Sequence, residues 1–110
     1  MKLPDLPSTV GKRGKWIHPP DNFVVHYEIA DEVRVVQSNL PGTKILCLQK
    51  IRFLDGRRPS DPATEVRLGY YIIGKKPSVR GRWVWGQYCT SMPYRDFRAL
   101  IRKAQKKGWL

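Results

Sequence analysis

From Phe23 onward, hydrophobic and polar residues alternate along the chain with the two-residue period of β-strands. The segment FVVHYEIA at 23–30 has one apolar face and therefore predicts a strand. The next segment, DEVRVVQS at 31–38, is rich in β-branched residues and also favours a strand, although part of its apolar pattern fits a helical stripe. NLPG at 39–42 has the composition of a turn.

Three further segments predict the rest of a sheet. KILCLQKIRFLDG at 44–56 is the longest strand candidate, and its first half is apolar on both faces, which is typical of a central strand. After a loop of about ten residues, EVRLGYYII at 65–73 and RWVWGQYC at 82–89 are expected to pair as a hairpin. They are joined by GKKPSVRG at 74–81, whose glycines at both ends suit a turn with a basic tip.

The clearest periodicity lies in the last twenty residues, SMPYRDFRALIRKAQKKGWL, and it predicts a helix. Ser91 is the expected N-cap and Gly108 the expected stop. The side chains expected to face the sheet are Phe97, Leu100, Ile101 and Ala104. The patterns together predict an α+β fold, an antiparallel sheet of four to five strands with a C-terminal helix packed on one face.

Residues 1–22 lack this patterning. They hold four prolines and the basic cluster GKRGK, so we expect a flexible, basic, proline-rich arm before a single α+β domain at 23–110. The chain has no apolar run near the roughly 18 residues of a membrane span, and its start has no apolar stretch typical of a secretory signal. The default expectation is a cytoplasmic protein that does not bind membranes.

Charge changes the picture most. The chain has 21 Lys and Arg against 9 Asp and Glu, a net charge of +12. Residues 17–65 are nearly neutral, with six basic and seven acidic residues, whereas residues 66–110 hold eleven basic residues and one acid, Asp96. Such a region repels itself, so an anionic partner that relieves the repulsion is expected.

The basic residues expected to contact phosphates form three groups, in the arm, at the hairpin tip and along one face of the helix. Arginine predominates among them, also at Arg67, and its planar fork suits phosphates and guanine edges. If the chain brings the tip and the helix together, they form one continuous cationic surface. The predicted nucleic-acid-binding residues are Lys12, Arg13, Lys15, Lys75, Lys76, Arg80, Arg82, Arg95, Arg98, Arg102 and Lys106.

Aromatic residues between 70 and 85 divide between the two faces of the sheet. Tyr70 and Tyr71 must point to opposite faces, and the one that points outward could stack on an unpaired base. Trp83 and Trp85 share a face and are expected in the core, because a small domain needs large side chains inside.

Two other classes of function remain open. The protein could be an interaction module for an acidic protein partner. It could also be a metal-dependent nuclease with His18 or His26 as a general base, although no catalytic motif is complete. The acids available for this are Asp21, Glu28, Asp31, Glu32, Asp55, Asp61 and Glu65.

The remaining reactive residues predict no cofactor and no metal site. Cys47 and Cys89 lie in strand patterns outside any C-x-x-C pair, so we expect reduced, buried thiols, and the ligand spacings of a structural zinc site are missing. The favoured function is a small basic nucleic-acid-binding protein. DNA is favoured over RNA because the aromatic and glycine pattern of an RNP motif is absent. The oligomeric state is left open.

Overall fold

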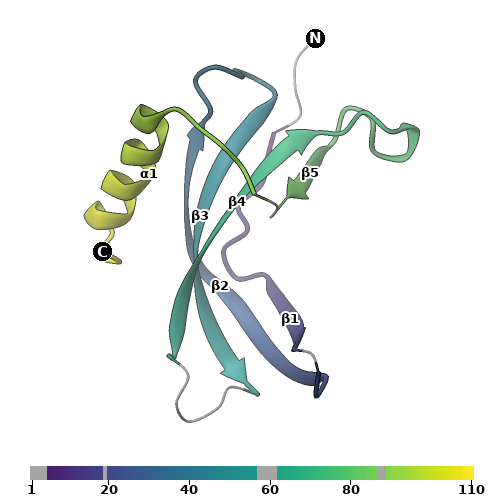
Figure 1. Cartoon of the computed structure of the whole chain (residues 1–110), viewed down its shortest axis with the longest axis vertical. Coiled ribbons are helices and arrows are strands. Elements are labelled where there is room, and N and C mark those ends of the chain that lie inside the picture. The colour runs from purple at the N-terminus through teal and green to yellow at the C-terminus, as the bar shows by residue number, and fades with distance from the viewer. Residues whose placement is uncertain (1–4, 19, 57–61, 87–88) are drawn as a thin grey trace. The chain divides into compact units, whose positions relative to one another are not determined.

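A computed structural model describes residues 5–18, 20–56, 62–86 and 89–110. Five antiparallel strands form one curled sheet in the order β1-β2-β3-β4-β5, and a C-terminal helix packs on β2 and β3 (Figure 1). The predicted α+β class is therefore confirmed. The elements are β1 Arg13–His18, β2 Phe23–Val36, β3 Lys44–Asp55, β4 Thr64–Ile73, β5 Trp83–Gly86 and α1 Tyr94–Lys106, with a short 3-10 helix, η1, at Pro77–Val79.

The middle of the sheet agrees with the hydrophobic pattern. β3 is the third of five strands, and residues on both of its faces are buried, as predicted for a central strand. Residues 31–36 of the ambiguous segment at 31–38 belong to β2, a single strand of 14 residues that ends at Val36. The strand interpretation, which the β-branched residues favoured, is confirmed for these residues.

Strand β1 was not anticipated, because residues 13–18 fall inside the segment predicted to be a flexible arm. This segment pairs antiparallel with β2, with Trp16 opposite Val25. The Trp16 ring stacks on Tyr27, with 4.6 Å between the ring centroids, and meets Phe53 edge to face at 5.5 Å. Large aromatic contacts across the strands thus hold a segment that has little apolar periodicity of its own.

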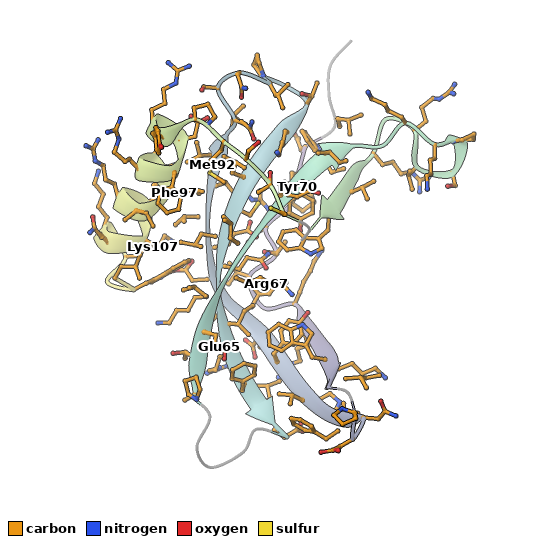
Figure 2. All side chains as sticks on the ribbon, viewed as in Figure 1. Glu65, Arg67, Tyr70, Met92, Phe97 and Lys107 are labelled. Atoms are coloured by element: carbon orange, nitrogen blue, oxygen red, sulfur yellow. The ribbon has the colours of Figure 1, made fainter. Side chains whose placement is uncertain are left out.

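The chain divides into two compact units, and the single domain expected at 23–110 stays a prediction. Unit 1 comprises Met1–Pro7, Val33–Leu48 and Leu68–Leu110, and unit 2 comprises Ser8–Glu32 and Gln49–Arg67. In unit 1, buried residues of β2, β3 and α1 form a core against which Tyr70 and Met92 pack (Figure 2). The buried core residues are Val33, Leu46, Leu48, Leu100 and Ala104.

The two ends of α1 differ from each other in how well the sequence predicted them. Pro93 occupies the N-cap position without a side-chain hydrogen bond, so the prediction of Ser91 as N-cap was wrong. Gly108 has φ of +80°, and its N–H donates to the Gln105 carbonyl while the N–H of Trp109 donates to the Ala104 carbonyl. These two bonds form a Schellman motif, which confirms Gly108 as the stop.

The apolar stripe of α1 is narrower than predicted. Leu100 and Ala104 are buried against the sheet, but Phe97 is 46% exposed and Ile101 is half-buried. Phe97 therefore lies at the margin of the contact rather than within it (Figure 2). No helix in the described part of the chain is long and apolar enough to cross a membrane.

Candidate nucleic-acid interface

The positive charge is concentrated in one of the two units. Unit 1 contains thirteen Lys and Arg but only two acids, Asp5 and Asp96, so its net charge is +11. Unit 2 contains eight Lys and Arg and seven acids, a net charge of +1. Segments distant in sequence thus gather nearly all of the excess charge into one compact body.

The acid on α1 is withdrawn from the surface. Asp96 is 5% exposed, and one of its carboxylate oxygens accepts hydrogen bonds from the Ser38 backbone N–H at 2.9 Å and the Ser38 hydroxyl at 3.0 Å. The same hydroxyl accepts a bond from Nε of Arg95 at 2.9 Å. These contacts fix the first turn of α1 to the turn that follows β2, and they leave Asp96 little opportunity to neutralise the outer face of the helix.

That outer face carries the row of basic residues that the sequence predicted. Its members are separated by three or four positions, which places them on one side of the helix, and all are exposed. The row spans about 17 Å at the helical rise per residue. Side chains with nitrogen ends extend from α1 away from the strands (Figure 2). We call this set the basic face of α1: Arg95, Arg98, Arg102 and Lys106.

The hairpin tip forms a second basic group. Gly74 and Arg80 are bridged across the loop, Gly81 has φ of +77°, and η1 lies between them. A side chain at Gly74 would come within 2.4 Å of the Val79 carbonyl oxygen, so the closed loop requires glycine there. All four basic side chains of this basic tip are exposed: Lys75, Lys76, Arg80 and Arg82.

The two groups do not form one continuous surface. Both belong to unit 1, but α1 packs on β2 and β3, whereas the tip extends β4 and β5 toward the opposite side of that unit (Figure 1). The sequence made a combined surface conditional on the chain bringing the tip and the helix together, and whether it does depends on which strands the helix covers. Each basic group is an independent candidate contact.

Tyr70 and Tyr71 are both half-buried. Tyr70 packs against the core of unit 1, and Nζ of Lys44 lies 4.9 Å from its ring centroid. Tyr71 meets Trp85 edge to face, with 5.0 Å between centroids. Their role in base stacking stays a prediction, and packing restricts access to both rings.

Lys44 is itself partly enclosed. Its Nζ donates to the Thr90 hydroxyl and lies over the Tyr70 ring. Burial lowers the pKa of Lys44 below its ordinary value of 10.5, because desolvation disfavours the charged ammonium. Its ammonium is therefore engaged with Tyr70 and Thr90 rather than with the basic face of α1.

A residue that the sequence analysis left out stands beside the basic face. Tyr94, the first residue of α1, is 86% exposed, the largest fraction among the exposed large hydrophobic residues of the described part. Its position four residues before Arg98 places the two side chains next to each other on the helix surface. Tyr94 has the spacing of the apolar stripe, three residues before Phe97 and seven before Ile101, so helical spacing alone does not reveal its exposure.

The arm cluster belongs to unit 2 and is partly compensated there. Lys12, Arg13 and Lys15 are exposed, and Nε of Arg13 lies 3.8 Å from Oε2 of Glu28. Arg67, expected among the phosphate-binding arginines, instead donates to the Gln49 side-chain oxygen at 2.6 and 2.9 Å and to the Tyr27 hydroxyl at 3.1 Å. That arginine holds strands together.

The acids considered for a nuclease are dispersed. The residues at 5–18, 20–56, 62–86 and 89–110 contain no group of three or more His, Cys, Asp or Glu side chains that could hold a metal ion. Nδ1 of His26 lies 2.5 Å from Oδ1 of Asp55 in an exposed pair. Asp61 and the His18 side chain lie outside what the structure describes.

The two cysteines differ in burial. Cys47 is buried and Cys89 is exposed, and both are free thiols. The prediction of two buried thiols was therefore right for Cys47 and wrong for Cys89, which follows β5 rather than lying within it.

No family model matches the chain, and neither a curated protein nor a solved structure matches it. The case for an interface on unit 1 therefore rests on its charge, burial and helix geometry.

Proposed function

We propose that this protein binds nucleic acids, DNA in preference to RNA, and that the basic face of α1 makes the main contact with phosphates. The basic tip makes a second, separate contact. The observation that carries the proposal is the charge of unit 1: thirteen basic residues stand against two acids, one of which, Asp96, is buried in the first turn of α1.

The basic face of α1 is suited to binding a row of phosphates. Arginine side chains on a rigid helix can reach successive phosphates, and each neutralised phosphate releases condensed counterions, which drives association. The helix start is fixed by Asp96 and Ser38, so the row is presented without much loss of backbone freedom on binding. DNA is favoured because the sequence lacks the aromatic pattern of RNP-type RNA readers.

Two variants with the same loss of charge distinguish a defined interface from general attraction. The helix variant carries Arg98→Gln, Arg102→Gln and Lys106→Gln, and the tip variant carries Lys75→Gln, Lys76→Gln and Arg80→Gln. All six side chains are exposed, so both variants should fold. Fluorescence anisotropy with duplex DNA, single-stranded DNA and RNA of equal length, at about 50 mM salt, measures the affinities.

We expect the helix variant to lose at least about tenfold more affinity than the tip variant, since the helix row is the main contact. Equal losses would show that net charge alone determines binding and would contradict the assignment to α1. If the unchanged protein binds none of the three ligands, the proposal fails, and an acidic protein becomes the preferred partner.

A further inference from the structure

We infer that Tyr94 is a base-stacking residue, and that the protein prefers nucleic acids with unpaired bases. This inference rests on the proposed function and deepens it, because it names the form of nucleic acid that the basic face of α1 recognises. It begins from the exposure of the Tyr94 side chain, 86%, at the start of a helix whose Leu100 and Ala104 are buried.

Single exposed hydrophobic residues are common on protein surfaces, so exposure alone means little. The evidence for a binding role comes from the residues next to Tyr94. Arg95 follows it directly, and Arg98, one turn later, is adjacent on the helix surface. A tyrosine ring and a guanidinium plane side by side can both stack on a flat base, while the arginines also reach the phosphates flanking that base.

Phe97 extends the aromatic surface. It lies three positions after Tyr94, which makes the two side chains neighbours, and 46% of it is exposed. Phe97 therefore adds a second, partly exposed ring next to Tyr94, on the side of α1 nearer the strands (Figure 2). Aromatic rings combined with a cationic surface are used for sequence-tolerant binding of single strands.

The anchoring of the helix start supports a direct role for this ring. Asp96 is buried and holds Ser38 through two hydrogen bonds, and Arg95 is bonded to the same hydroxyl. The backbone that carries Tyr94 is thus fixed although its side chain is free to meet a ligand. A preorganised ring loses less entropy on binding than one on a mobile loop.

Comparing the affinity for a duplex with the affinity for a single strand distinguishes base stacking from phosphate contacts. In a duplex the faces of the bases are already stacked on each other, so Tyr94 can reach only unpaired bases, whereas the arginines can bind phosphates in either form. The inference therefore predicts that loss of the ring weakens binding to a single strand and leaves duplex binding nearly unchanged.

The experiment uses the full chain, a 12-nucleotide DNA strand with a central 2-aminopurine, its RNA equivalent, and the corresponding duplex. Tyr94→Leu removes the ring, and Tyr94→Phe is the matched control that keeps it. We expect Tyr94→Leu to weaken single-strand binding by about 5- to 100-fold, with Tyr94→Phe within about twofold of the unchanged protein. The 2-aminopurine fluorescence should be quenched by the unchanged protein and by Tyr94→Phe, but not by Tyr94→Leu.

The outcomes separate the inference from the proposed function. If the unchanged protein binds neither form, the proposed function fails. If it binds both forms and Tyr94→Leu leaves single-strand affinity and quenching unaltered, nucleic-acid binding stands and the stacking role of Tyr94 is wrong. Equal weakening on single strand and duplex would also overturn that role, since it would point to a general effect on the basic face.

Discussion

Gln49 occupies a core position of β3, yet every hydrogen-bonding group of its side chain is used. Its nitrogen donates to Oε2 of Glu32 at 2.7 Å and to the Thr9 hydroxyl at 3.3 Å, and its oxygen accepts two bonds from Arg67. Gln49 is fully buried and Thr9 nearly so. Within unit 2, this network joins three strands and the residues that precede β1, so it specifies their alignment through polar groups.

Replacing Gln49 by methionine should lower the free energy of unfolding by about 2–4 kcal/mol, because it removes the buried amide that bonds to Arg67, Glu32 and Thr9. Gln37→Met is a matched control, since Gln37 is also buried, its side-chain nitrogen donates to Asn39 at 2.9 Å, and its side-chain oxygen has no hydrogen-bond partner in the described part of the chain. That change should alter stability by no more than about 1 kcal/mol. Urea denaturation measures both, and equal losses would contradict the role assigned to the network.

At the level of elements, α1 depends on the backbone at its end as well as on its apolar stripe. Gly108 adopts φ of +80°, and nothing lies within 4 Å of the place where a β-carbon would stand. The cost of a side chain there is therefore one of backbone conformation alone. Trp109, which follows, packs against the core of unit 1 and connects the helix end to the sheet.

Gly108→Ala should destabilise the protein by about 1 kcal/mol, because alanine resists the left-handed conformation. Gly108→Asn should cost less, since asparagine tolerates that conformation better. Urea denaturation of the two variants tests the ranking. A larger loss for asparagine than for alanine would show that side-chain volume, rather than backbone conformation, limits this position.

The elements that the sequence predicted well are those in which local periodicity and burial agree. β3 is apolar on both faces and lies at the centre, and Leu100 and Ala104 of α1 are buried as their spacing requires. β1 was missed because it depends on Trp16 stacking across the strands on Tyr27, which no local pattern encodes. The spatial separation of the tip from α1 was left open for a related reason, since it follows from sheet order and the strands that the helix covers.

Among the site residues too, local spacing could be read from the sequence, whereas contacts made by strand pairing could not. The basic face of α1 was predictable, because residues three and four apart on a helix share a side. Arg67 was misjudged because its partners, Gln49 and Tyr27, are distant in sequence and are brought to it only by strand pairing. Tyr94 was overlooked although its helical position next to Arg98 could have been derived from the sequence.

For the whole molecule, the uneven charge is the property that most needs a partner. Unit 1 has a net charge of +11, whereas unit 2 has a net charge of +1. The basic residues of unit 1 repel one another within one compact body, which lowers stability, and an anionic ligand would offset this loss. Phosphate contacts can be measured through salt dependence. Each neutralised phosphate releases counterions and adds a fixed amount to the slope of log affinity against log salt.

The most direct measurement is the affinity for a nucleic-acid strand as salt is raised from about 50 to 200 mM. We predict a linear fall of log affinity with log salt, with a slope of about −4 or steeper if at least six phosphates are contacted. Combining Arg98→Gln, Arg102→Gln and Lys106→Gln should make this slope shallower by about 3, because about three phosphate contacts are lost. An affinity independent of salt, or a slope that those three changes leave as it was, would contradict the assignment of phosphate binding to the basic face of α1.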